Sequence, residues 1–240
     1  MVGAFRLLAA VVFVLSIPAA LLTTNVRFII DEQRVYRHAI DEFGGVQATR
    51  ISRAELLRAS AELRAYFKNS QDVVAIRVEQ GGREVSLFNP RETAHLKDVK
   101  DRFHLVNRIQ EFSVLYLLVY VAAVVLWARE VTLRGLALRV VAGCVLTMAL
   151  IGGSAAVALA GFDSAWADFH ELIFSNDFWR LNPATDHLIQ MFPPDFWESI
   201  VFFIGLLAAA EAALILIAAG IYLGVTSREA SAQRLQPYYA

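Results

Sequence analysis

Four long stretches without charged side chains constrain this 240-residue chain more than any other feature. They run over Leu7–Leu22, Phe112–Ala128, Val140–Phe162 and Ile200–Val225, and the last is interrupted only by Glu211. An α-helix needs about 20 mostly apolar residues to cross a bilayer core of roughly 30 Å. Charged residues make up 19% of the chain, and the deficit is concentrated in these stretches. The sequence therefore predicts an α-helical polytopic membrane protein with four transmembrane helices.

The basic residues predict how the chain is oriented. Residues 129–139 carry Arg129, Arg134 and Arg139, whereas residues 163–199 carry only Arg180 against seven acids. Short loops rich in Arg and Lys remain in the cytoplasm, so both termini are predicted to be cytoplasmic. The predicted segments are transmembrane helices at 1–24, 112–128, 140–162 and 200–225, an extracytoplasmic domain at 25–111, a cytoplasmic loop at 129–139, an extracytoplasmic interfacial loop at 163–199 and a cytoplasmic tail at 226–240.

The first apolar stretch has a second interpretation. Arg6, the apolar run and Pro18-Ala19-Ala20 also resemble a secretory signal peptide. The run continues to Leu22 and no small-x-small cleavage pattern follows it, which favours a retained helix. Cleavage would remove one helix and leave the other loops on the same sides of the membrane.

The long outer segment predicts a small α+β domain that begins with helices. One helix is expected over Asp31–Phe43, ended by Gly44-Gly45. Ser52-x-x-Glu55 is a capping-box pattern, and the apolar residues that follow recur at helical spacing. A second helix is therefore predicted from this box to about Phe67.

A β-hairpin is predicted in the second half of the same segment. Asp72–Glu79 and Arg83–Phe88 are β-rich and flank Gly81-Gly82, a pair that suits a two-residue turn. Asn89-Pro90 then breaks the chain. A helix is expected from Arg91 onward into the second transmembrane stretch.

Composition argues against several classes of protein and site. The net charge is −1, without the basic excess typical of nucleic-acid binders. The single cysteine, Cys144, excludes an intramolecular disulfide, and its apolar surroundings are typical of a small buried hydrophobe. His and Cys residues show none of the familiar metal-ligand spacings. We predict neither a cofactor nor a metal, and no nucleic-acid partner.

The second outer segment is unusually aromatic. Trp166, Phe169 and Trp179 are among its nine Phe and Trp residues, counted from Phe162, and its three prolines exclude one continuous helix. Amphipathic aromatic side chains settle at the level of the lipid headgroups. Two compatible interpretations follow: a loop on the outer leaflet, and a cap over a site that opens to lipid.

Two of the five histidines stand out as candidate acid/base groups. His95 shares a predicted helix face with Arg91 and Asp98, at spacings of four and three. A carboxylate near an imidazole can fix its tautomer and raise its pKa. His170 follows Asp168 and lies among acids and aromatic rings just beyond the third transmembrane stretch. The alternatives are an exposed charged turn for the first and a headgroup-level histidine without a role for the second.

The segments around these histidines resemble one protein family. E-x-x-H-L-x-D-V-K over Glu92–Lys100 and F-H-x-x-x-F-x-N-x-x-W over Phe169–Trp179 are similar to motifs of the lipoprotein intramolecular transacylase (Lit) family of bacterial membrane proteins. Asn182-Pro183, Asp186, Leu188-Ile189 and Pro193-x-x-Phe196 continue the likeness, and the layout of four spans and two outer loops is similar too. The Asp31–Phe67 part matches only in general layout.

The resemblance implies a specific reaction. Such enzymes move the sn-2 acyl chain of a diacylglyceryl-cysteine lipoprotein to the amine of that cysteine, which gives a lyso-form lipoprotein. It implies catalytic roles for His95 and His170, a site at the outer leaflet of the bacterial cytoplasmic membrane, diacylglyceryl lipoproteins as substrate and membrane lipid as partner. The residues expected to support the two histidines are Asp98, Arg91, Glu92, Lys100, Asn176, Trp179 and Asp186.

The residues themselves agree with this chemistry. The substrate amine is the nucleophile, so the enzyme needs no Ser, Cys or Lys nucleophile. Donor and acceptor lie in one molecule, and well-oriented intramolecular reactions reach effective molarities of about 10⁵–10⁸ M. Positioned acid/base groups such as His95 and His170 contribute roughly 10²–10⁴-fold. The sequence does not assign base and acid between them.

Glu211 lies apart from this set. An acid within a transmembrane helix costs a few kcal/mol unless it is paired or protonated. Its position places it about half-way down the fourth helix, well below the histidines. Two interpretations are open: a polar contact inside the helix bundle near the substrate, or a protonated acid that bonds a Ser or Thr of a neighbouring helix, for which Thr147 and Ser154 on the third helix are the candidates.

Two other functions compete with the transacylase. The outer domain of a non-enzymatic membrane sensor or assembly factor would bind a ligand or partner, and the histidines would be incidental. A small transporter is the weakest alternative, since Glu211 is the only charge within the spans and no internal repeat is visible.

Overall fold

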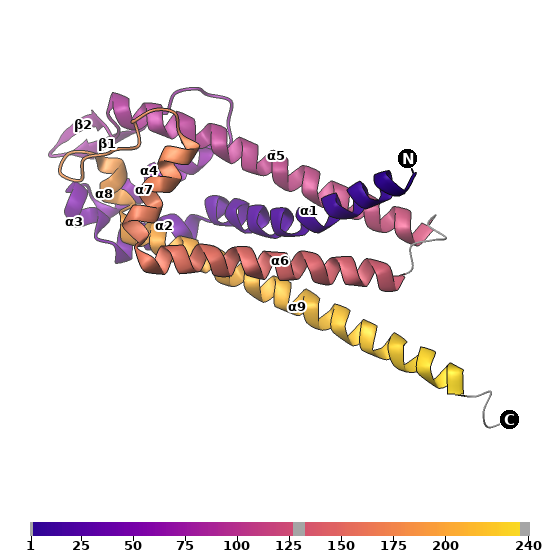
Figure 1. The fold of residues 1–240 in the computed structure, drawn as a ribbon. Coiled ribbons are helices and arrows are strands. Elements are labelled where there is room, and N and C mark those ends of the chain that lie inside the picture. Colours follow the sequence, from indigo (N-terminus) through magenta and orange to yellow (C-terminus); the bar gives the residue numbers. More distant parts are fainter. Residues whose placement is uncertain (1, 127–132, 236–240) are drawn as a thin grey trace. The chain divides into compact units, whose positions relative to one another are not determined.

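A computed structural model describes residues 2–126 and 133–235 of the chain (Figure 1). The predicted inner loop is thus described only from residue 133 and the predicted tail only to residue 235; Arg129 lies outside the described residues. The elements in chain order are α1 (Val2–Asp31), α2 (Gln33–Glu42), α3 (Gly45–Thr49), α4 (Arg53–Tyr66), β1 (Arg77–Gln80), β2 (Arg83–Ser86), α5 (Pro90–Leu126), α6 (Leu133–Ala160), α7 (Phe162–Ile173), α8 (His187–Met191) and α9 (Pro194–Leu235).

Four helices in the described part of the chain are long and apolar enough to span a membrane. They are α1, α5, α6 and α9; α1 and α9 contain the first and last uncharged stretches, and α5 and α6 contain all but the last two residues of the other two. Together with the two-stranded sheet, they confirm the predicted fold class. The helices extend beyond the apolar stretches because no helix breaker marks where the apolar residues end: α1, for example, continues through Asn25 to Asp31.

The chain divides into two compact units. The first, here the span unit, comprises residues 1–25, 108–154 and 205–240; the second, here the domain unit, comprises residues 26–107 and 155–204. The division cuts α1, α5, α6 and α9, so each long helix contributes one part to each unit.

Helix α4 forms the centre of the domain unit. Its buried Leu56, Ala59 and Leu63 recur at helical spacing and belong to a core that includes residues of α2, of the hairpin and of the first turns of α9. The Ser52 Oγ accepts a hydrogen bond from the backbone N–H of Glu55, which confirms the predicted helix start. The Glu55 carboxylate does not complete a capping box; it accepts from the Glu79 backbone N–H of β1 instead.

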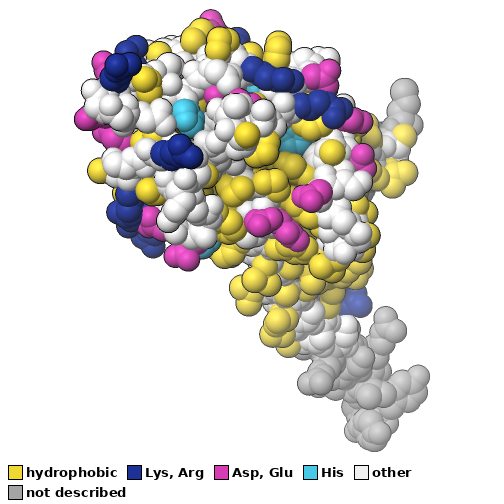
Figure 2. Space-filling view, turned by 90° about the vertical axis from the view of Figure 1, so that its left-hand side faces the viewer, with side chains coloured by type: hydrophobic (Ala, Val, Ile, Leu, Met, Phe, Trp, Pro, Cys, Tyr) yellow, Lys and Arg dark blue, Asp and Glu magenta, His cyan; other side chains and the backbone are white. Residues whose placement is uncertain are grey.

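The hairpin is antiparallel, with Arg77 opposite Ser86 and Gln80 opposite Arg83. Gly81 and Gly82 both have positive φ values, +61° and +77°, which a two-residue turn of the type I′ class requires. The strands are shorter than predicted, although one further backbone bond joins Leu87 to Ile76. Figure 2 shows Lys and Arg intermixed with Asp and Glu at this end of the domain unit, where the hairpin and α3 lie.

The expected helix over Asp31–Phe43 is shorter than predicted. α1 continues to Asp31, and the next helix, α2, begins at Gln33 after a break at Glu32. The Glu32 carboxylate accepts from the Arg34 backbone N–H and so caps α2. The break between α1 and α2 therefore lies at a capping acid and not at a glycine.

The span unit packs around small residues. A Cβ atom on Gly143 of α6 would overlap the Ile17 side chain of α1, so this approach of the two helices requires a glycine. Phe13, Ile17, Cys144 and Ala212 form the buried core here. Cys144 is fully buried, as the sequence predicts.

The expected partners of Glu211 were wrong. Its carboxylate accepts from the side-chain amide of Asn25 on α1 at 2.8 Å, whereas the Thr147 hydroxyl donates to the Gly143 carbonyl of its own helix. Asn25 lies just past the end of the first apolar stretch, so Glu211 is level with that end and not half-way along the span. The reason is that α9 begins within the domain unit, and its part in the span unit starts only at Gly205.

Candidate active site

His170 is held in the last turn of α7 by a bond that sets its tautomer. The ring Nδ1 lies 2.7 Å from the Trp166 carbonyl one turn earlier. Because a carbonyl oxygen can only accept, Nδ1 carries the hydrogen, and the lone pair of the neutral ring is on Nε2. The ring is 8% exposed. The basic Nε2 of His170 is thus left without a hydrogen bond to α7.

His95 reaches the same place from α5. Its ring centroid lies 6.1 Å from that of His170, although 75 positions separate the two in the chain. His95 is 7% exposed, and among the described residues its Nδ1 is buried without a hydrogen-bond partner. Two imidazoles thus face one small volume, and neither is on an exposed turn.

Aromatic rings enclose the pair. Phe174 contacts both histidines, with centroid distances of 5.2 Å to His95 and 5.6 Å to His170. Trp166 meets the His170 ring edge-on at 4.7 Å, and Trp179 lies 5.0 Å away. These rings replace water around the imidazoles, which strengthens electrostatic interactions inside the site.

This enclosure reverses the expected shift of the His95 pKa. The pKa of His95 is lowered to about 4: burial is the largest cause, the neighbouring His170 adds to it, and Asp98 opposes both without overcoming them. Burial also lowers the pKa of His170, against the opposing effect of the bond to Trp166. Asp98 does act to raise the His95 pKa, as expected, but the net shift is downward because burial and His170 outweigh it. Both rings are neutral at pH 7.

The comparisons with known proteins agree with this geometry. The family profile described as "Lipoprotein intramolecular transacylase Lit" matches residues 11–197, which is more than half of the chain. The chain belongs to the Lit family. It is accordingly an acyltransferase that acts on lipoproteins and a multi-pass membrane protein. The assignment favours the enzyme over the sensor and the transporter.

Solved structures of Lit from Bacillus cereus, a membrane-integral lipoprotein intramolecular transacylase, share the fold. One has a TM-score of 0.78 at 19% sequence identity and covers 95% of this chain and 99% of its own. Two variants of that protein, in which one histidine is replaced by arginine or by alanine, have TM-scores of 0.73 at 18% identity; both cover 95% of this chain and 96% and 97% of their own chains. No curated protein matches the chain by sequence.

In this Lit-family chain, Glu92 and Asp186 join the start of α5 to the start of α8. The Glu92 carboxylate, 1% exposed, accepts from the backbone N–H of Asn89 at 2.7 Å and from that of Leu188 at 2.6 Å. The Asn89 side-chain amide donates to Asp186, whose other oxygen accepts from the Asn182 backbone N–H. Burial raises the pKa of Glu92, while the two N–H groups lower it. Both acids hold the backbone, and neither contacts an imidazole through a hydrogen bond.

Asp98 and Asn176 fasten the loop that carries the aromatic rings. The Asn176 side-chain amide donates to the Asp98 carboxylate at 2.8 Å, and its oxygen accepts from the Phe178 backbone N–H. Arg91 donates to the Asp177 carbonyl of the same loop at 2.7 Å. These bonds hold Phe174 and Trp179 against the histidines. This role explains why the bonding residues lie close to His95 and to His170 in the sequence.

Lys100 lies outside the histidine pair. Its ammonium bonds the Asn69 side chain at 2.9 Å and the Gln71 carbonyl at 2.7 Å, and it lies 4.1 Å from the centre of the Tyr66 ring. Burial lowers the pKa of Lys100. Its partners are in the loop after α4, so it fastens that loop to α5.

The remaining three histidines have local partners. His104 bonds the Phe67 carbonyl, His187 bonds the Leu87 carbonyl, and His38 packs edge-on against Phe43. Within residues 2–126 and 133–235, no three His, Cys, Asp or Glu side chains are grouped as metal ligands.

Sequence reasoning missed the role of Trp166. Its carbonyl orients His170, and its ring encloses it. The position of Trp166, four residues before His170 on a predicted helix, is only a weak signal of this bond. Every helical residue has a backbone carbonyl four positions before it.

Proposed function

We propose that this protein moves the acyl chain at sn-2 of a diacylglyceryl-cysteine to the amine of the same cysteine and releases a lyso-form lipoprotein. The observation that carries the proposal is the pair of buried, neutral imidazoles, His95 and His170, with ring centroids 6.1 Å apart. That spacing suits two groups on opposite sides of one reacting carbonyl.

The reaction needs no co-reactant. The ammonium first loses a proton, and the amine nitrogen then attacks the carbonyl carbon of the sn-2 ester. The tetrahedral intermediate collapses with cleavage of the bond between the carbonyl carbon and the glycerol oxygen. A second nitrogen proton leaves, and the glycerol oxygen gains a proton. An ester and an amine become an amide and an alcohol.

The geometry suggests a division of roles. His170 suits the base, because its Nδ1–H is committed to the Trp166 carbonyl and its Nε2 lone pair is free to take the amine proton and return it to the glycerol oxygen. His95, whose pKa is about 4, stays neutral at physiological pH. A neutral imidazole in an enclosed site can donate a hydrogen bond to the developing oxyanion without itself being deprotonated.

The location of the site follows from charge. The domain unit contains His95, His170 and residues 163–199. Residues 163–199 carry one basic residue and seven acids. By the rule that basic loops stay inside, this unit lies at the outer face of the bacterial cytoplasmic membrane, with both termini in the cytoplasm and membrane lipid beside the site.

A substrate with two different acyl chains tests the reaction. A synthetic diacylglyceryl lipopeptide with a C16 chain at sn-1 and a C17 chain at sn-2 would be incubated with the purified protein in detergent. Tandem mass spectrometry should find the C17 chain on the cysteine amine and the C16 chain on glycerol. A free amine after long incubation, or a C16 chain on nitrogen, would contradict the proposal. The mirror substrate, with the chains exchanged, is the control for chain-length preference.

A further inference from the structure

The side chains of α4 follow one edge of strand β1. The Glu55 carboxylate accepts from the Glu79 backbone N–H at 2.9 Å, and the Arg58 guanidinium donates to the Arg77 carbonyl at 2.6 Å. Arg77 and Glu79 are the strand residues whose backbone groups point away from β2, since the alternate residues pair with that strand. Helix α4 thus covers the outer edge of β1.

These contacts from α4 side chains to the backbone end at Arg77, the first residue of β1. Ile76 accepts from the Leu87 backbone N–H, so it faces the hairpin, and Ala75 faces the same side as Arg77. The next helix residue in line, Glu62, bonds to Arg58. Among the described residues, no hydrogen bond satisfies the backbone N–H or C=O of Ala75. The backbone of this one residue, two positions before β1, is therefore left without a partner in the described part of the chain.

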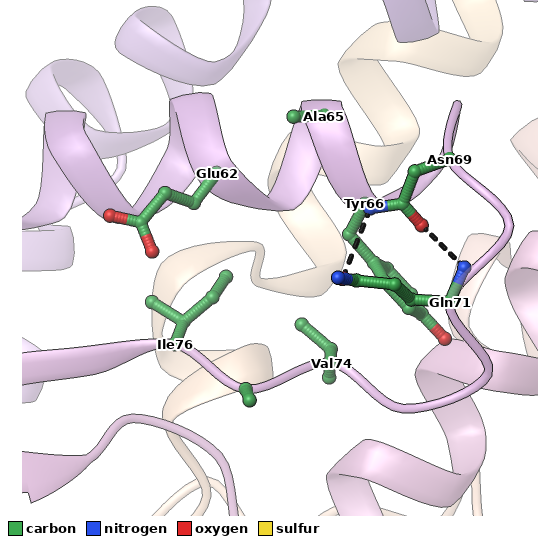
Figure 3. Close-up of a pocket in the computed structure, with 8 residues that line it drawn as sticks. Glu62, Ala65, Tyr66, Asn69, Gln71, Val74 and Ile76 are labelled. Carbon is green, nitrogen blue, oxygen red and sulfur yellow. Dashed lines mark hydrogen bonds between the residues drawn. The ribbon is translucent and has the colours of Figure 1, made fainter.

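A pocket of about 220 Å³ opens at this place (Figure 3). It lies between α4 and the extended segment that precedes β1, and its lining includes Glu62, Ala65, Tyr66 and Val74–Ile76. Asn69 and Gln71 close one end and are bonded to each other through side chain and backbone. Lys100 ties this end of the pocket to α5.

We infer that this pocket binds the polypeptide that follows the lipidated cysteine of the substrate, as a short extended strand paired with Ala75. The inference rests on the proposed function. An unpaired strand edge recognises a peptide through its backbone, and the pocket beside it accepts alternate side chains. Backbone recognition suits an enzyme whose substrates share a lipidated cysteine and differ in the residues after it.

Helix α5 joins the histidine site to the end of the pocket. Lys97 pairs with Asp72 at 3.3 Å, and Lys100 bonds the same loop, so α5 connects the pocket to His95. Five helical residues from His95 to Lys100 rise about 7.5 Å along the axis. Six extended residues span at most about 20 Å. A peptide of six to eight residues after the cysteine therefore extends well past the axial rise from His95 to Lys100, whereas a peptide of two residues spans at most about 7 Å.

Peptide length gives the kinetic test. The ratio of kcat/KM for a lipopeptide with eight residues after the cysteine to one with two residues would be measured for the wild type, Ala65→Phe and Ala61→Phe. We expect a ratio of about ten for the wild type, the effect of one to two net backbone hydrogen bonds. Ala65→Phe fills the pocket and should reduce the ratio to about one. Ala61→Phe, on the same helix and outside the lining, should keep it. A wild-type ratio near one, or an unchanged ratio in Ala65→Phe, overturns the inference.

A cross-linking test does not depend on turnover. The long lipopeptide would carry a photoreactive benzophenone residue at the sixth position after the cysteine, and labelled protein fragments would be identified by mass spectrometry. Labelling within residues 62–76 that is lost in Ala65→Phe supports the pocket, and labelling elsewhere overturns it. If neither lipopeptide is converted, the proposed function fails, and this result still decides whether the pocket binds the peptide.

Discussion

Replacing Glu92 with alanine should destabilise the domain unit strongly without touching the chemistry. The substitution leaves two backbone N–H groups, those of Asn89 and Leu188, without their acceptor. A buried donor left unsatisfied costs about 1–3 kcal/mol. The sum for the two donors is roughly 2–6 kcal/mol, which is a large share of the 5–15 kcal/mol that typically stabilises a folded domain.

Glu92→Gln offers a graded comparison. The amide keeps one acceptor oxygen but places an NH₂ group against the second backbone N–H. We expect about half of the alanine effect, roughly 1–3 kcal/mol. Glu84→Ala is the matched control, since this acid on β2 is 68% exposed and forms only a surface ion pair. Its effect should stay within about 0.5 kcal/mol.

Tryptophan fluorescence during urea unfolding in mild detergent is the assay. Trp166, Trp179 and Trp197 all belong to the domain unit, so the signal reports mainly on the part of the molecule that contains Glu92. The order Glu92→Ala, then Glu92→Gln, then Glu84→Ala is expected for the loss of unfolding free energy. A loss below about 0.5 kcal/mol for Glu92→Ala would refute the reasoning, because the two N–H groups would then have other partners.

Three further predictions follow from other parts of the structure. The pKa of His95 is about 4 in the folded protein and about 6.5 in the unfolded chain, so its contribution to stability is fully present above pH 6.5 and is lost as the pH falls through 4. Measured by urea unfolding, the wild type should lose up to roughly 3 kcal/mol of unfolding free energy across this window, and His95→Asn should lose less. Asn25→Leu removes the amide that bonds Glu211 and should destabilise the span unit by roughly 1–3 kcal/mol, seen as faster thiol labelling of the single buried cysteine, whereas unchanged labelling would speak against the bond. Gly143→Ala places a methyl group against Ile17 and should cost about 1–3 kcal/mol by the same labelling assay; an unaltered rate would mean that the helices separate freely.

The local features were predictable because their causes are local. Apolar run length predicts the four spans, Gly81-Gly82 predicts the hairpin turn, and Ser52 predicts the start of α4. Each depends on a few neighbouring residues and on backbone sterics. The likeness around His95 and His170 also pointed to the correct family.

The features that were not predicted correctly depend on tertiary packing. The partner of Glu211 follows from how far α9 extends into the domain unit, which hydrophobicity along one helix does not encode. The direction of the His95 pKa shift depends on burial by Phe174 and on His170. Neither lies near His95 in the sequence, whereas Asp98 lies one helical turn away, so only its effect on the pKa could be predicted.

The most direct test of the central claim compares single histidine variants in the same mass-spectrometric assay. The wild type, His95→Ala, His170→Ala and the control His104→Ala would each be incubated with the diacylglyceryl lipopeptide, after fluorescence has shown that each is folded. We predict that His104→Ala keeps N-acylation within about twofold of the wild type, whereas His95→Ala and His170→Ala each lose at least 10²-fold. Retention of near wild-type N-acylation by folded His95→Ala or His170→Ala would contradict an acyl transfer centred on these two imidazoles.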